Sequence, residues 1–154
     1  MATLYLSLGT NLGDRESNLE TALTLIGQKV GTVKAVSAVK ETEPWGFEST
    51  NRFMNMAVKV STELDPKQAL LTTQEIENLM GRTEKTTSDG YKDRIIDIDL
   101  LMYDNLILET PELTLPHKFM HKRRFVLEPL EEIAPHLVHP ILGKTVKALL
   151  EETD

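Results

Sequence analysis

The chain has 154 residues, of which 40% are hydrophobic and 27% are charged, and its formal net charge is -7. Such a chain is typical of one soluble globular domain, and its negative charge argues against a general nucleic-acid binder. The absence of cysteine excludes disulfides and thiolate metal sites. No basic segment of a signal peptide and no membrane-length apolar run is present. We therefore expect a single domain over residues 1–154, in the cytoplasm, with no membrane partner.

Strand and helix patterns alternate through the first two thirds of the chain. Alternating apolar and polar residues predict four strands, at 3–8, 33–39, 53–62 and within 92–104. Apolar residues at helical spacing predict two helices, one that begins near Ser17 and ends at Gly31, and one over 64–81. Ser17 and Glu20 have capping-box spacing at the start of the first helix.

The second helix has the clearer start. Asp65 is a natural N-cap, Pro66 suits the first helical position, and Gln68 is placed to complete a capping box. The resulting order β-α-β-β-α-β predicts an α+β fold, a ferredoxin-like βαββαβ sandwich whose two helices cover one face of an antiparallel sheet. Extra short elements follow at the C-terminal end, a strand near 106–109 and helices near 126–133 and 144–151.

The fourth strand carries two carboxylates. Its apolar face toward the helices would hold Ile96, Ile98, Leu100 and Met102. Asp97 and Asp99 would then point away from the helices, at a spacing that lets both bind one divalent cation. Carboxylate oxygens suit Mg²⁺, which completes its coordination with water and substrate phosphates. Solvated acids on an exposed strand face would give the same D-x-D pattern.

Other residues strengthen the interpretation as a phosphate site. Arg82 and Arg94 flank a polar loop just before the two aspartates, and arginine forks bind phosphate oxygens. Carboxylates for Mg²⁺ with arginines for phosphate are the requirements of phosphoryl transfer. The basic stretch 117–125 is either solvated surface charge or a site for an anionic ligand.

A further group indicates an organic ligand. Trp45 lies in a turn-rich loop, and Phe53 and Asn55 fall on the carboxylate side of the third strand. Aromatic rings with an amide could enclose a flat heterocycle and bind its polar edge. A small apolar patch covered by Trp45 and Phe53 is the alternative.

Five segments follow one another in the order and spacing of a known family. They are LSLGTNLGD (6–14), ETEPWGFESTNRFMNMAV (41–58), QEIENLMGR (74–82), DRIIDIDLLMYDN (93–105) and LTLPHKFMHKRRFVLEPLEEIAPHLVHP (113–140). The hallmark Arg-x-x-Asp-hydrophobic-Asp stands at Arg94, Asp97 and Asp99. On these segments the chain resembles hydroxymethyl-dihydropterin pyrophosphokinases of folate biosynthesis over essentially its full length.

The resemblance implies transfer of pyrophosphate from ATP to the hydroxymethyl group of 6-hydroxymethyl-7,8-dihydropterin, with release of AMP. It implies two Mg²⁺ ions on Asp97 and Asp99, and catalytic roles for Arg82 and Arg94. Its pterin contacts fall on Thr42, Glu43, Trp45, Phe53, Asn55, Tyr91 and Phe125. Its nucleotide contacts fall on Gln74, Glu77, Leu100, Thr114, His117 and Arg123. We expect ATP and the pterin as the only partners of a monomer.

The chain departs from the family pattern around the loop. Tyr91-Lys92-Asp93 replaces the common Trp-Gly-Pro, and Glu84 and Glu112 stand where arginines occur in relatives. Another Mg²⁺-dependent phosphoryl- or nucleotidyltransferase is one alternative, although the LGTNLGD turn lies far upstream of Asp97 instead of shortly before it. A non-catalytic ferredoxin-like ligand-binding module is another, although it would not need the aspartates and arginines together.

Overall fold

The structure, a computed structural model, describes residues 1–42, 52–81 and 95–153. Its strands are β1 (Ala2–Thr10), β2 (Gly31–Val36), β3 (Lys40–Thr42), β4 (Phe53–Thr62), β5 (Asp97–Tyr103), β6 (Leu108–Glu109) and β7 (Thr114–Leu115). Its helices are α1 (Arg15–Lys29), α2 (Pro66–Leu79), the 3-10 turn η1 (Met120–Lys122), α3 (Arg124–Ile133) and α4 (Val146–Glu152). The termini of the predicted elements shift by a few residues, as boundaries set by local signals often do.

The main sheet is antiparallel, with the order β2-β4-β1-β5 and with β3 added beside β4. The predicted α+β fold with an antiparallel sheet is confirmed. The strand predicted over 33–39 is divided, because β2 ends at Val36 and the chain pairs again only from Lys40. At the break, Ser37 binds the main chain of Ala57 through both its N–H and its hydroxyl group, each at 2.9 Å.

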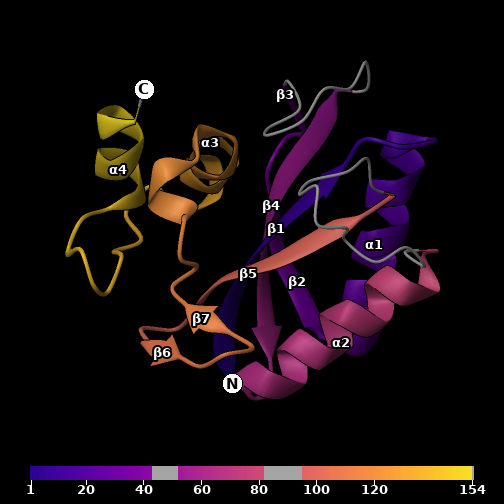
Figure 1. Cartoon of the computed structure of the whole chain (residues 1–154), viewed down its shortest axis with the longest axis horizontal. Coiled ribbons are helices and arrows are strands. Elements are labelled where there is room, and N and C mark those ends of the chain that lie inside the picture. The colour runs from indigo at the N-terminus through magenta and orange to yellow at the C-terminus, as the bar shows by residue number, and fades with distance from the viewer. Residues whose placement is uncertain (43–51, 82–94, 154) are drawn as a thin grey trace.

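Helices cover both faces of the sheet (Figure 1). α1 and α2 lie on one face over a core that includes Leu6, Leu8, Ile26, Val58 and Ile76. α3 lies against the opposite face, over a second core that includes Tyr5, Ala57, Leu127 and Leu130, and α4 packs beside α3 and adds Leu149 to this core. The two sandwich helices therefore share one face as predicted, and the extra C-terminal elements occupy part of the other.

The two long helices start differently from one another. Asp65 accepts a hydrogen bond from the Gln68 main chain at 2.8 Å while the Gln68 side chain accepts from the Asp65 N–H at 3.2 Å, so the predicted capping box is present. The capping box predicted at Ser17 is wrong. Asp14 is the N-cap of α1, and its carboxylate accepts from the Ser17 N–H at 3.0 Å, because Ser17 already lies in the first turn.

A β-bulge changes the alternation of β5. Leu6 pairs with Leu100 and Tyr5 pairs with Met102, which leaves Leu101 as an extra residue. Ile96, Ile98 and Leu100 pack under α1 and α2, as predicted, but Leu101 and Met102 both pack with the second core. The predicted placement of Met102 beside Leu100 is therefore wrong, because strict alternation does not continue through a bulge.

Candidate active site

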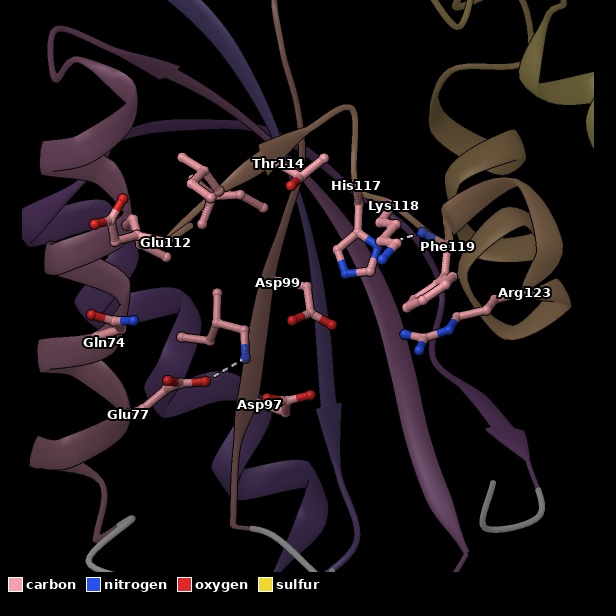
Figure 2. A pocket seen from close by; sticks show the side chains of 14 residues that line it. Gln74, Glu77, Asp97, Asp99, Glu112, Thr114, His117, Lys118, Phe119 and Arg123 are labelled. Carbon is pink, nitrogen blue, oxygen red and sulfur yellow. Dashed lines mark hydrogen bonds between the residues drawn. The ribbon is translucent and has the colours of Figure 1, made fainter. Parts of the chain in front are cut away.

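A pocket of about 420 Å³ opens along the outer edge of β5 (Figure 2). β5 is the edge strand of the sheet, so the backbone on this side has no neighbouring strand. α2 forms one wall, with Leu70, Gln74 and Glu77. The segment that follows β6 supplies the other lining residues, and its His117, Lys118, Phe119 and Arg123 form the wall opposite α2. Glu112, Leu113 and Thr114 of the same segment complete the lining.

Asp97 and Asp99 form the floor of this pocket. Both are partly exposed, while their neighbours Ile98 and Leu100 are buried toward α1 and α2. The predicted orientation away from the sandwich helices is therefore confirmed. On the neighbouring strand, Gly9 pairs with Asp97 and Ser7 pairs with Asp99, so small residues lie beside both carboxylates.

Glu77 ties α2 to the strand that carries the aspartates. Its side chain is only 6% exposed, and its Oε2 accepts a hydrogen bond from the Ile98 N–H at 2.8 Å. Ile98 is the residue between Asp97 and Asp99, and its N–H lies on the open edge of β5. The carboxylate thus occupies the place that a neighbouring strand would otherwise take.

His117 faces the aspartates from the opposite wall (Figure 2). Its main-chain N–H donates to the Leu101 carbonyl at 2.8 Å, and its Nδ1 accepts from the Phe119 N–H at 3.1 Å. The pKa of His117 is lowered to about 4, chiefly by burial and then by the positive charge of Arg123, while Asp97 offsets part of this effect. The ring is therefore neutral at pH 7 and carries its proton on Nε2.

Arg123 lies on the same wall as His117 and contacts two aromatic rings. Its guanidinium carbon is 5.2 Å from the centre of the Phe119 ring and 5.6 Å from that of Phe125, within the range of a cation–π contact. The residue is 9% exposed and still lines the pocket. Lys118 adds a second cation, with Nζ 5.3 Å from the centre of the Phe119 ring.

The described residues that line the pocket carry an excess of negative charge, which favours the binding of a divalent cation there. Four carboxylates line the pocket, those of Glu77, Asp97, Asp99 and Glu112, against two permanent cations, Lys118 and Arg123. A polyphosphate alone would meet an excess of negative charge, and a bound divalent cation reverses the local sign. Asp97 and Asp99 offer the hard oxygen donors that Mg²⁺ prefers, and the described residues contain no cluster of three or more ligating side chains. Mg²⁺ held by two carboxylates completes its coordination with water and substrate phosphates.

Phe53 and Asn55, two of the predicted pterin residues, lie on the same face of the sheet, two strands away. Asn55 on β4 pairs with Gly9 on β1, and Gly9 pairs with Asp97 on β5, so one row crosses the three strands. A Cβ atom on Gly9 would stand 3.2 Å from Oδ1 of Asn55 and 3.7 Å from the Phe53 ring. The side chain of Asn55 is 4% exposed and donates to the Thr42 hydroxyl at 2.9 Å. The missing side chain of Gly9 leaves room over the sheet between Asn55 and Asp97.

The structure brings all six predicted nucleotide residues together. The pocket that holds Asp97 and Asp99 is also lined by Gln74, Glu77, Leu100, Thr114, His117 and Arg123. Thr42, Phe53 and Asn55 form the separate group on β3 and β4, and Phe125 reaches the pocket through its contact with Arg123. Five other predicted residues lie outside the described part of the chain: Glu43, Trp45, Arg82, Tyr91 and Arg94.

Sequence reasoning missed several residues of this region. Lys118 and Phe119 lie inside the basic stretch 117–125, whose local charge could have indicated Lys118 but not Phe119. Gly9 gives a weaker signal, since a glycine inside a strand often marks the close approach of another group. Leu70 and Leu113 carry no signal of their own, because apolar residues that line a pocket look like core residues in a sequence.

Comparison with known proteins identifies the family. The family model described as 7,8-dihydro-6-hydroxymethylpterin-pyrophosphokinase (HPPK) matches residues 5–135. The 2-amino-4-hydroxy-6-hydroxymethyldihydropteridine pyrophosphokinase of Porphyromonas gingivalis is 48% identical over 141 residues, which cover 91% of this chain and 95% of that protein. The enzyme of the same name from Aquifex aeolicus is 38% identical over 152 residues, which cover 99% of this chain and 92% of that protein.

Solved structures agree on the fold. A Plasmodium falciparum HPPK-DHPS structure matches 98% of this chain with a TM-score of 0.81 at 19% sequence identity. The match covers 43% of that longer chain, so this protein spans less than half of its length. Together with the sequence matches, these findings show that the chain belongs to the 7,8-dihydro-6-hydroxymethylpterin-pyrophosphokinase family.

Proposed function

We propose that the protein transfers the pyrophosphoryl group of ATP to the hydroxymethyl oxygen of 6-hydroxymethyl-7,8-dihydropterin, with ATP bound in the pocket beside β5. The observation that carries this proposal is the division of the pocket into carboxylates on the floor and on α2, and cations with a neutral histidine on the opposite wall. Membership of the family and the matching names of relatives at up to 48% identity support the reaction.

Asp97 and Asp99 would hold Mg²⁺, two ions as in the family. Bound Mg²⁺ neutralises phosphate charge and fixes the phosphates for in-line transfer. Arg123 and Lys118 would donate to phosphate oxygens from the opposite wall. His117 contributes a neutral Nε2–H, which can donate to an oxygen without adding a positive charge. The hydrogen bond from Ile98 to Glu77 holds the backbone between the two aspartates.

The pterin would lie over the row from Asn55 to Gly9, with its hydroxymethyl group toward Asp97. An amide offers both a donor and an acceptor, which suits the edge of a pterin ring. In the reaction the hydroxymethyl oxygen forms a bond to the β-phosphorus, and the bond from that phosphorus to the α-phosphate oxygen breaks. AMP leaves and the hydroxyl proton is lost. Arg82 and Arg94, carried over from the family, would stabilise the charge that develops on the phosphates.

The reaction products test the proposal against its alternatives. The purified protein is incubated with ATP and Mg²⁺, with and without the pterin, and the nucleotides and pterins are separated and identified by mass. We expect AMP and the pterin diphosphate in equal amounts, and neither product without the pterin. Formation of ADP would indicate a simple kinase, release of pyrophosphate a nucleotidyltransferase, and no turnover a binding module, and each of these results would overturn the proposal.

We also propose that residues 1–154 work as one domain and as a monomer in the cytoplasm. The matched Porphyromonas gingivalis protein is covered over 95% of its length, which leaves little room for a second domain in that relative. Among the residues that the structure describes, no helix is long and apolar enough to cross a membrane. Light scattering of the purified chain tests the monomer, for which a mass of 17.4 kDa is expected. Twice that mass would contradict it.

A further inference from the structure

We propose that Phe119 is a positioning residue for the reaction, whose ring holds the Arg123 guanidinium in place at the nucleotide pocket. The proposal rests on the binding of ATP in that pocket. Phe119 is 42% exposed and lines the pocket, and it belongs to neither of the two hydrophobic cores that the described residues form. Figure 2 shows it on the same wall as His117 and Arg123.

The contacts of Arg123 define what the Phe119 ring does. The guanidinium stands 5.2 Å from the centre of the Phe119 ring and 5.6 Å from that of Phe125. A guanidinium donates hydrogen bonds in its own plane, whereas stacked rings cover its faces. Aromatic contacts therefore restrict the side chain while they keep its in-plane donors suited to phosphate oxygens.

Holding an arginine in place has an energetic value. A flexible arginine side chain loses rotamer entropy when a ligand fixes it. The contact with the Phe119 ring restricts Arg123 before the nucleotide arrives, so less of this entropy is lost on binding. The ring of Phe125, a predicted pterin contact, also contacts the guanidinium. Arg123 thus contacts an aromatic residue of the nucleotide pocket and one expected to contact the pterin.

The main chain of Phe119 makes a hydrogen bond that does not depend on its ring. Its N–H donates to Nδ1 of His117 at 3.1 Å, and this bond survives any side-chain substitution other than proline. A change of the ring therefore leaves the tautomer of His117 in place. Substitutions at Phe119 test the contacts of the ring with Arg123 and, at 5.3 Å, with Lys118.

The experiment compares Phe119→Leu, which removes the ring, with Phe119→Tyr, which keeps it. Affinity for Mg²⁺ and a non-hydrolysable ATP analogue is measured by calorimetry, and AMP formation gives kcat and KM for both substrates. We expect Phe119→Leu to weaken analogue binding by roughly 3- to 10-fold, the scale of one cation–π contact. Phe119→Tyr should bind within about twofold of the unmodified protein, and the pterin KM should not change. Ile107→Ala, an exposed apolar residue away from the pocket, is the control.

A double-mutant cycle tests whether Phe119 acts through Arg123. In an Arg123→Ala background, Phe119→Leu should have no further effect on analogue binding. An undiminished effect there would mean that the ring acts through another contact, with the nucleotide, Lys118 or His117, and it would overturn the positioning role, as would unchanged binding in Phe119→Leu alone. Phe119→Met repeats the comparison if the leucine variant has a lowered melting temperature. If Arg123→Ala alone leaves analogue binding unchanged, the placement of ATP in this pocket fails, a different result from a failure confined to Phe119.

Discussion

Glu77 offers the sharpest test of how the structure supports the two aspartates. In Glu77→Ala, the Ile98 N–H on the open edge of β5 loses its acceptor, which now stands at 2.8 Å and is almost fully buried. Loss of a hydrogen bond to a charged group costs roughly 1.5–3 kcal/mol. For a chain of this size, each kcal/mol lowers the melting temperature by about 2–4 °C, so we expect a decrease of about 3–12 °C.

The functional effect should follow from the same contact. Ile98 lies between Asp97 and Asp99, so a shift of its backbone moves both carboxylates together. Small displacements of reacting groups lower rates by up to about 10²-fold. We therefore expect turnover in Glu77→Ala to fall by roughly 10- to 10²-fold, and half-maximal activity to require a higher Mg²⁺ concentration.

Glu77→Gln separates the hydrogen bond from the charge. The amide oxygen can still accept from Ile98, whereas the negative charge near Asp97 and Asp99 is gone. Differential scanning fluorimetry and Mg²⁺ titrations of AMP formation measure both variants. If the hydrogen bond matters most, Glu77→Gln should retain most of the stability and of the Mg²⁺ dependence. Equal losses in the two variants, or a Glu77→Ala defect in ATP affinity with an unchanged melting temperature, would refute the reasoning.

Three further predictions concern the metal, the pterin and pH. Asp97→Asn or Asp99→Asn should abolish most AMP formation with little loss of melting temperature, and unfolding of either variant would contradict a metal-binding role. Gly9→Ala and Asn55→Ala should each weaken pterin binding, the latter by about 1–3 kcal/mol. Calorimetry with an ATP analogue present measures this affinity, and an unchanged value would contradict the proposed pterin site. The pKa of His117 is about 4 in the folded protein against 6.5 in the unfolded chain, so its contribution to the free energy of unfolding is fully present above pH 6.5. Up to about 3 kcal/mol of this free energy is lost as pH falls toward 4. Urea unfolding of His117→Gln at pH 7 and 4.5 should show a smaller loss in acid than the unmodified protein, and an equal loss would exclude His117 as the cause.

The fold was most predictable where local signals decide the structure. β4 spans Phe53–Thr62, as its alternation predicted, and α2 has the predicted capping box at Asp65 and Gln68. Both features depend on residues that are neighbours in sequence. The bulge at Leu101 and the packing of α3 on the second face depend on contacts between distant segments, and no single window of sequence contains them.

The candidate site was predictable to a similar degree and for a similar reason. Alternation alone placed Asp97 and Asp99 on one face, and the structure agrees. The hydrogen bond of Glu77 was harder to predict from the sequence, because its partner is a backbone N–H that any residue other than proline at position 98 would supply. Phe119 was missed since an aromatic residue in a basic stretch gives no sign that its ring will meet Arg123.

The extra residue in β5 has a consequence for how this strand tolerates change over evolution. Upstream of Leu101 the strand presents carboxylates to the pocket, and from Leu101 on it packs with the core beneath the C-terminal helices. Substitutions in one half need not disturb the other, so the two halves can diverge independently. Deletion of Leu101 would remove the extra residue and leave Leu6 paired with Leu100 and Tyr5 with Met102. Both aspartates would then keep their place on the face away from α1 and α2, whereas insertion of a further residue between Asp99 and Leu100, with the downstream half fixed by its packing, would turn them toward the apolar layer beneath these helices.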